Sequence, residues 1–538
     1  MNMAFYIARK DFRLHLRSSR FVLTLLLCLL LVPFTILTGT DNYFIRQTAC
    51  QQGKAAADSA LNSAYVWSQV RPLVIKETEP LSIFCEGVTP GMGIYNQILL
   101  DAYPLLPQTN ISNDYSVIGF KQAEIRGDTG NNDNVFLNTF SYTDFTGIIG
   151  LVFSLLALVF SYDAFSHEKE SGMLRMVFSR PVNRVSFLLG KIGGVFLVLV
   201  FPALLCFAVS TGYLVYAGIS LPATGWNGIL LLLLLTFGFI FVCILLGILI
   251  SLLVRTSEQA LTISLLLWMG MVFILPPVSS YLAETIAPIP LYRNIETQME
   301  LLDNELYYKL KDIRQKYEKE EKVETEMALF NNMGADGFVD KWGITIPFAH
   351  AIRGTHTESE PMRIAYSDRK WQLQKEYLEK LKRQIRLKHW LACLSPLQVF
   401  QETALRICHT APDNYLSYMD EVREYRQTVW EYFTANYLFS SYAYFTTQSE
   451  KDFMTNEEMD NLCQEYDKSW SEEKKADFLK SIDDRPKLDT KGLPRFTQQM
   501  VSIREQEKSF LDAFLFFAMA SLVLIYITTK LSARYDIR

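Results

Sequence analysis

The chain has 538 residues, of which 50% are hydrophobic and 20% are charged, and its formal net charge at pH 7 is −5. This composition is too apolar for an ordinary water-soluble protein of that length. The small net charge says little about partners, and we expect no nucleic acid among them.

The first segment, residues 1–20, is predicted to form an amphipathic helix on the membrane surface. Its apolar residues recur at helical spacing while basic residues collect elsewhere: Phe5, Ala8, Phe12 and Leu16 against Arg9, Lys10, Arg13, Arg17 and Arg20. The basic cluster ahead of the first apolar run places the N-terminus in the cytoplasm by the positive-inside rule. The segment is either a plain orientation signal or a dedicated docking element.

Six apolar runs approach or exceed the ~20 residues that a helix needs to cross a bilayer. None carries a charge at its centre, where one costs roughly 2.5–3.5 kcal/mol, and Asp512 lies near an end. The predicted spans cover residues 21–37 (retained, not cleaved), 145–162, 192–216, 228–253, 260–282 and 510–529. We therefore predict an all-α polytopic membrane protein whose tail, residues 530–538, is cytoplasmic like the N-terminus.

This topology leaves residues 38–144 outside the cytoplasm, where we expect a small mixed α/β domain. The segment has turn signals such as Thr89-Pro90-Gly91 and short alternating apolar stretches at 116–120 and 135–140. Of eight cysteines, five face outward, an odd number that leaves at least one free or paired between chains. Cys50 and Cys85 are candidates for a disulfide bridge.

The turn between the second and third spans, residues 163–191, has the spacing of a short amphipathic helix. Apolar residues recur at helical spacing from Phe165 through Leu174 and Phe178 and interleave with charged residues, and Pro181 ends the helix because proline lacks the donor. A rigid helix that projects from the membrane can transmit displacement from a soluble partner into the attached spans.

Residues 283–509 form the second outer region, which we predict to be a larger helical domain. Apolar stripes over 295–317 and 371–385 predict an antiparallel helical hairpin, either a lever or an ordinary helical domain. Aromatic residues are dense from Tyr415 to Phe445. They fit a packed helix core with an interfacial aromatic belt or, alternatively, an apolar surface for a substrate or partner.

Three short motifs between the second and third spans resemble those of type-2 ABC exporter permeases. They read Glu168-Lys-Glu-Ser-Gly172-Met-Leu174, Ser179-Arg-Pro181-Val-Asn-Arg184 and Gly190-Lys191, with Met173 in place of the usual small hydroxyl residue. Residues 7–12, Ile-Ala-Arg-Lys-Asp-Phe, look like the elbow helix of that family. The resemblance covers residues 1–37 and 145–282, and the insertion before the last span looks like a bacterial subgroup.

The resemblance implies that residues 163–191 form a coupling element that seats in a cleft of a separate ATP-binding subunit. The contact residues it implies are Glu168, Glu170, Gly172, Arg175, Ser179, Arg180, Pro181 and Arg184. It also implies a dimer with a second copy or a related permease, in a bacterial plasma (inner) membrane, with ATP and Mg on the partner subunit. The alternative is an ordinary cytosolic loop flanked by basic residues.

No Gly-x-x-x-x-Gly-Lys-Ser/Thr pattern occurs in the sequence, so we do not expect this chain to hydrolyse ATP or to hold a cofactor. His350 and His356 lie near Glu358 and Glu360, but their spacing does not place both on one helical face, and we predict no metal site.

The leading functional hypothesis is the permease subunit of an ATP-driven exporter, because no ionisable group in mid-membrane offers another source of energy. The rival is a membrane-anchored structural or mechanotransmitting protein that acts through its outer helical domain.

Overall fold

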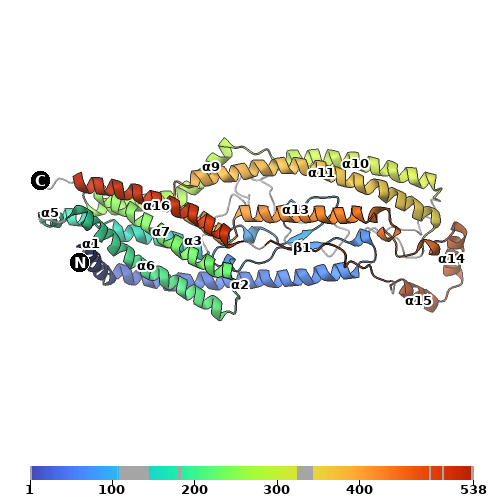
Figure 1. The fold of residues 1–538 in the computed structure, drawn as a ribbon, viewed down its shortest axis with the longest axis horizontal. Helices are drawn as coiled ribbons and strands as arrows, with labels where there is room; N and C mark the ends of the chain where they lie inside the picture. The colour runs from blue at the N-terminus through green and yellow to red at the C-terminus, as the bar shows by residue number, and fades with distance from the viewer. Residues whose placement is uncertain are drawn as a thin grey trace.

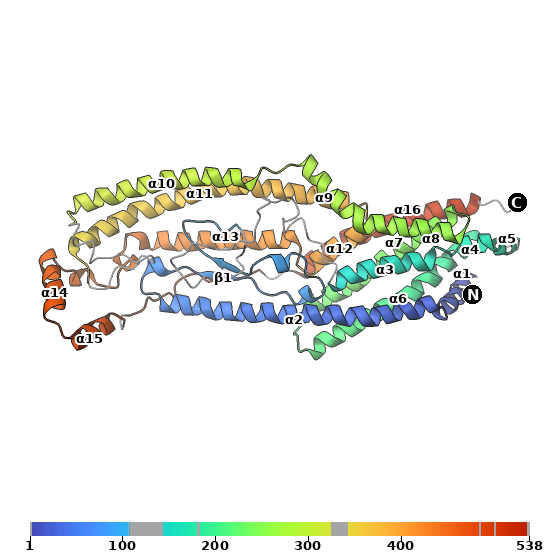
Figure 2. The same ribbon diagram turned by 180° about the vertical axis from the view of Figure 1, so that it is seen from behind.

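The computed structural model describes residues 3–105, 107, 144–179, 183–323, 343–483, 486–499 and 502–534. The molecule is elongated, with a helical bundle at one end and a second helical domain, called the distal domain below, at the other (Figure 1). The first and last helices, α1 and α16, both reach the bundle end, away from the distal domain (Figures 1 and 2).

Six helical segments among the described residues are long and apolar enough to cross a membrane, and each contains one predicted span or nearly all of it. The chain is therefore a multi-pass membrane protein. The helices of the bundle are α1 (Met3–Leu16), α2 (Ser19–Ser63), α3 (Phe145–Ser161), α4 (Ser166–Glu170), α5 (Met173–Phe178), α6 (Arg184–Tyr216), α7 (Ala223–Leu253), α8 (Ser257–Met269), the π-helical turn η5 (Gly270–Ile274), α9 (Leu275–Ile286) and α16 (Ile503–Arg534).

Side-chain caps fix where several of these helices begin. Ser18, Asp144, Asn183 and Thr256 each accept a hydrogen bond from a backbone N–H of the first turn of α2, α3, α6 and α8. Such caps satisfy donors that have no partner inside a helix.

Helix α7 is the centre of the bundle. It is the most apolar span and packs against α3, α6, α8, α12 and α16. Helices α8, α9 and α16 are the least buried, with large apolar side chains such as Leu266, Phe273 and Met519 turned outward.

The distal domain consists of the far half of α2, the helices α10 (Tyr292–Glu320), α11 (Ile346–Ala392), α13 (Pro412–Ala435), α14 (Asn456–Lys468) and α15 (Glu472–Asp483), and a small sheet. The sheet pairs β1 (Leu73–Ile75) with β2 (Tyr95–Gln97) antiparallel, with Leu73 opposite Gln97. In both ribbon views α13 lies between α2 and the α10–α11 pair (Figures 1 and 2). Short 3₁₀ turns occupy Trp67–Gln69, Pro80–Ile83 (η2), Thr89–Gly91, Leu438–Ser440, Tyr442–Tyr444 and Glu450–Asp452.

The predicted antiparallel hairpin is confirmed. Lys316 of α10 pairs with Glu358 of α11 at 2.9 Å, whereas Asp303 pairs with Lys370 at 2.8 Å, so the two helices run in opposite directions. Most of the dense aromatic residues, among them Tyr425 and Phe433, are buried in the core of the distal domain. The packed-core interpretation is therefore correct for these residues.

Two features of the bundle differ from the sequence-based expectation. Helix α2 continues beyond the predicted span 21–37 to Ser63, through Gly39 and Gly53, and its polar far half packs in the distal domain. Helix α12 (Pro396–Ile407), expected in the outer helical domain, instead packs against the ends of α3, α7 and α16 nearest that domain. The alternating stretches at 116–120 and 135–140 lie outside the described residues.

The structure places Cys50 and Cys85, the candidates for a disulfide bridge, apart from each other. Both residues are free thiols, and they sit in different clusters. Cys50 packs with Ile75 and Tyr95 under the small sheet, whereas Cys85 belongs to the core of the bundle.

Candidate functional site

The segment between α3 and α6 is two short helices, not the single helix that its spacing predicted. Helix α4 ends at Glu170 and α5 begins at Met173, with Gly172 between them at a φ of 71°. A side chain at Gly172 would meet no atom within 4 Å, so the glycine is needed for its left-handed backbone rather than for space. That backbone turns the chain and breaks the predicted helix.

A cluster of three charges joins α4 to α6 and α1. Lys191 Nζ of α6 lies 2.7 Å from Glu168 Oε1 of α4 and 3.1 Å from Asp11 Oδ2 of α1. All three side chains are at most 14% exposed. Breaking a buried charge network of this kind leaves an uncompensated charge, so the cluster holds the three helices in one arrangement.

Small residues on α6 let α1 approach it closely. A Cβ on Gly190 would lie 2.8 Å from Ile7 Cβ and 2.9 Å from the Ala4 carbonyl oxygen, and one on Gly194 would lie 2.8 Å from Asp11 Cβ. Glycines four residues apart form the flat helix face that such close contacts require. The motif Gly190-Lys191 therefore has a structural role. Gly190 lets α1 pack closely on α6, and Lys191 forms an ion pair with Asp11 of α1.

Helix α4 is also tied to the turn between α7 and α8. Lys169 Nζ donates to the carbonyl oxygens of Ser251, Leu252 and Val254 at 2.6–3.0 Å, and so caps the C-terminus of α7. Glu170 accepts hydrogen bonds from the N–H and the hydroxyl of Ser257 at the start of α8. A displacement of α4 is therefore passed directly to both helices.

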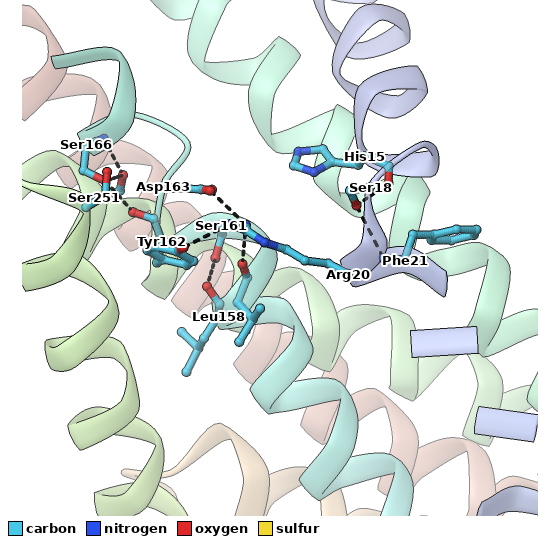
Figure 3. Close-up of polar contacts among 12 residues, drawn as sticks. His15, Ser18, Arg20, Phe21, Leu158, Ser161, Tyr162, Asp163, Ser166 and Ser251 are labelled. Carbon is cyan, nitrogen blue, oxygen red and sulfur yellow. Dashed lines mark hydrogen bonds and ion pairs between the residues drawn. The ribbon is translucent and has the colours of Figure 1, made fainter. Parts of the chain in front are cut away.

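The start of α2 and the end of α3 form a second polar contact beside this one. Arg20 donates to Asp163 at 2.8 Å and to the Tyr162 hydroxyl at 3.0 Å (Figure 3). His15, at the end of α1, packs edge-on against Phe160, and burial lowers its pKa. Near Arg20, the Ser251 hydroxyl accepts from the backbone N–H of residue 166 at 2.9 Å, which fixes the beginning of α4 (Figure 3).

Helix α5 and the turn before it, at Ser171 and Gly172, form an exposed surface with an apolar centre. Met173 and Met176 are 51% and 71% exposed, while Leu174 is buried and anchors α5 to the bundle. The polar residues His167, Glu170 and Ser179 of the same segment are also exposed. Flexible, exposed methionines in a segment with exposed polar groups suit a protein contact surface.

The structure separates the predicted contact residues into different environments. Glu168 points inward to Lys191, and Arg184 donates to the Ser532 carbonyl oxygen at the end of α16. Glu170, Gly172 and Ser179 are exposed along α4 and α5. The Arg175 side chain, Arg180 and Pro181 lie outside the described part of the chain.

Sequence reasoning missed the roles of Asp11, Lys169, Met173 and Met176. The two methionines stand three residues apart next to a buried leucine, a spacing that marks an exposed helix face. No local pattern in the sequence shows that Asp11 and Lys191 meet, because they lie on separate helices.

The two histidines considered for a metal site contact different groups. His350 lies 3.7 Å from Glu321, and His356 lies 3.4 Å from Glu360. Within the described ranges, no group of three or more His, Cys, Asp or Glu side chains could hold a metal ion.

Comparison with known proteins gives one family match. A family model described as ABC-2 family transporter protein matches residues 5–429, which include α1, the α4 contacts and most of the distal domain. No curated protein matches the chain.

Proposed function

We propose, on the premise that the chain belongs to the ABC-2 transporter family and is a membrane permease of an ABC transporter, that a separate ATP-binding subunit docks on the α4–α5 face. ABC-2 permeases are transmembrane subunits that normally work with such a subunit. The exposed pair Met173 and Met176 would fill an apolar recess of the partner, and Glu170 and Ser179 would make polar contacts at its edge.

The observation that carries this proposal is the set of ionic and hydrogen-bonded contacts on α4. This five-residue helix contacts α1 and α6 through Lys191, α7 through Lys169, and α8 through Glu170. A force applied to α5 would reach four bundle helices through α4. Glu168 would act in this relay from inside rather than touch the partner.

We further propose that ATP and Mg bind only to the partner and that hydrolysis drives a substrate outward. The basic residues of α1 support an orientation with both termini in the cytoplasm and the distal domain outside a bacterial inner membrane. The outward-facing apolar side chains of α8, α9 and α16 leave room for a second permease, identical or related, across the translocation path.

The experiment is purification of the tagged chain in detergent from its native host, followed by identification of bound proteins and assay of ATP hydrolysis. Met176→Asp places a charge in the centre of the exposed face without touching a buried contact. We expect this variant to lose the ATP-binding subunit and its turnover.

Leu301→Asp is the matched control, because Leu301 is 66% exposed on α10, far from the proposed face. It should retain the subunit at the wild-type level. Recovery of the subunit with normal turnover in Met176→Asp would refute docking on this face.

One observation favours mechanical transmission to the distal domain as a second candidate function. Helix α2 runs unbroken from Ser19 to Ser63, and Gln384 of α11 caps the end of α9 by donating to the Ala287 carbonyl oxygen. Both connections join the bundle to the distal domain, so movement of the bundle would be passed to the distal domain.

Gln52→Pro tests this candidate, because Gln52 is exposed in the far half of α2 and proline breaks a helix. If the distal domain is the output, this variant loses the partners of that domain while ATP turnover stays normal. Gln52→Ala should keep both. Unchanged partner recovery in Gln52→Pro would contradict mechanical output.

A further inference from the structure

Two buried thiols meet where the distal domain joins the bundle. Cys85 lies two residues after the 3₁₀ turn η2, and Cys408 caps the end of α12. The Cys408 side chain is a neighbour of the Cys85 side chain, and both are at most 3% exposed in the same core cluster. The two cysteines therefore lie side by side although they are far apart in the chain.

The backbone around the pair fixes this contact independently of the thiols. The Val88 N–H donates to the Thr410 carbonyl oxygen at 3.2 Å. Gly87 has a φ of 54°, and a Cβ at that position would lie 2.4 Å from the same oxygen. Only glycine permits such a close approach. The segments that contain Cys85 and Cys408 are therefore held against each other next to the two cysteines.

The pair sits over the ends of two predicted spans. The Phe84 carbonyl oxygen accepts from the N–H of Thr146 in the first turn of α3 at 3.0 Å. On the other side, Gln506 of α16 donates to the Ile407 carbonyl oxygen at 3.1 Å. The thiols thus lie at the boundary between the bundle and the distal domain.

A second thiol pair provides an internal comparison. Cys28 of α2 and Cys206 of α6 also lie next to each other, but they are within the spans and line a small apolar pocket with Pro33 and Leu205. A water-soluble oxidant reaches the boundary between domains more readily than the interior of a span. Cys50 has no cysteine neighbour in its cluster.

We propose that Cys85 and Cys408 form a disulfide that fastens the first distal segment to α12. This inference goes beyond the proposed transport function and uses only its orientation, in which the boundary lies outside the cytoplasm. Disulfides form and persist in such oxidising compartments.

The oxidant is a thiol–disulfide oxidoreductase of that compartment, which acts as the chain folds and before the two segments bury the thiols. Both S–H bonds break, and one S–S bond forms between Cys85 and Cys408. The two electrons and two protons pass to the disulfide of the oxidoreductase, which is left as a dithiol.

The bridge would close a loop that contains α3 to α12, so it would strongly restrict the unfolded chain. In the folded protein it would keep α12 fixed to η2 while the bundle helices move.

Peptide mapping of the full chain tests the proposal. Membranes are dissolved in denaturant with excess N-ethylmaleimide, so that every free thiol is alkylated, and the protein is digested with and without reductant. We expect a reductant-sensitive peptide pair joining Cys85 to Cys408, and alkylated Cys28 and Cys206. Cys85→Ser should convert Cys408 into an alkylated thiol, and Cys50→Ser, the matched control, should leave the pair intact.

Alkylation of both Cys85 and Cys408 in the wild type, or a bridge from Cys85 to Cys50, would overturn the proposal. Oxidation of intact membranes with diamide then identifies the faulty premise. A Cys85–Cys408 bridge that appears only after diamide means that the compartment is reducing and the orientation is wrong, whereas its continued absence means that the contact is wrong. Neither result bears on docking of the ATP-binding subunit, which is measured separately.

Discussion

The two ends of the bundle are held together by different forces. At the α4 junction, formed by Asp11, Glu168, Lys169, Glu170 and Lys191, charged side chains join the helices. At the α12 junction, where α12 meets α3, α7 and α16, aromatic packing and neutral hydrogen bonds join them, as in the stack of Phe400 on Phe239.

The difference suggests which end moves. Charged side chains at the α4 junction can exchange one charged or polar partner for another when a docked subunit offers it, whereas interdigitated aromatic rings cannot separate without opening a cavity. We therefore expect the α4 junction to rearrange during the transport cycle and the α12 junction to stay closed.

The largest loss of folding stability is expected from a substitution at the α12 junction. Phe400 is 1% exposed, and its ring centroid lies 4.7 Å from that of Phe239. Phe400→Ala should lower the free energy of unfolding in detergent by about 3–5 kcal/mol, because it leaves a cavity. Phe514→Ala, on the outward face of α16, is the control and should change the unfolding midpoint little. Equal midpoints for the two variants would show that α12 is not tightly packed.

A smaller loss is expected when the charge cluster of the α4 junction is broken. Lys191→Met leaves Asp11 and Glu168 facing each other without a cation. We expect a loss of roughly 2–3 kcal/mol, below the 3–5 typical of fully buried pairs because these groups retain some solvent contact.

Lys54→Met provides the comparison, since it breaks the exposed pair with Glu77 and should cost less than about 1 kcal/mol. Thermal unfolding of the three proteins in one detergent measures both losses. Similar midpoints for Lys191→Met and Lys54→Met would mean that the cluster does not hold α1 and α4.

The packing of α1 on α6 can be tested with one pair of glycines on the same helix. Gly190→Ala introduces a Cβ within 2.9 Å of the Ala4 carbonyl oxygen and should destabilise the protein by about 1–3 kcal/mol. Gly212→Ala meets no atom within 4 Å and should be neutral or slightly stabilising, because alanine favours a helix. A melting temperature that falls equally in both variants would argue against close docking of α1.

The smallest effect on stability depends on pH and concerns two half-buried titratable groups, Glu402 of α12 and His389 of α11. Burial raises the pKa of Glu402 to about 8. The nearby cations Lys388 and Arg406 act to lower this pKa, and the carboxylate of Asp413 acts to raise it. Burial lowers the pKa of His389, which lies 3.4 Å from Glu402, to about 4. Glu284 of α9 also faces Lys388.

The two groups act in opposite directions on stability. The folded chain keeps the Glu402 proton that the unfolded chain releases near pH 4.5, so stability from Glu402 is lost as the pH rises from 4.5 to 8. The unfolded chain protonates His389 near pH 6.5, so stability from His389 is lost as the pH falls from 6.5 to 4.

Glu402→Gln should therefore flatten the decline of the melting temperature between pH 6.5 and 8. Glu379→Gln, an exposed glutamate of α11, should leave the wild-type curve unchanged. A wild-type decline that persists in Glu402→Gln would assign it to another group.

Much of the architecture could be predicted because its signals are local. The six spans follow from uninterrupted apolar runs, and the α10–α11 hairpin follows from two apolar stripes. The break at Gly172 was missed because apolar spacing continues across it, and a glycine shows its left-handed backbone only in three dimensions.

The candidate site was predicted by position but not by the direction of its side chains. The motifs placed the relevant residues between the second and third spans, where α4 and α5 lie. Glu168 was expected to face a partner, yet its carboxylate is drawn inward by Lys191. Charge alone cannot tell an inward glutamate from an outward one, since the distinction depends on which cation the fold brings near.

By itself the sequence determined the membrane class, the number of spans and the location of the α4–α5 segment, because hydrophobicity and helical periodicity act over neighbouring residues. Only the tertiary structure decided that Asp11 meets Lys191, that α12 packs against the spans, and that Cys85 lies beside Cys408 and not Cys50. Contacts between residues so far apart in the chain arise from how whole helices pack, and no local pattern encodes them.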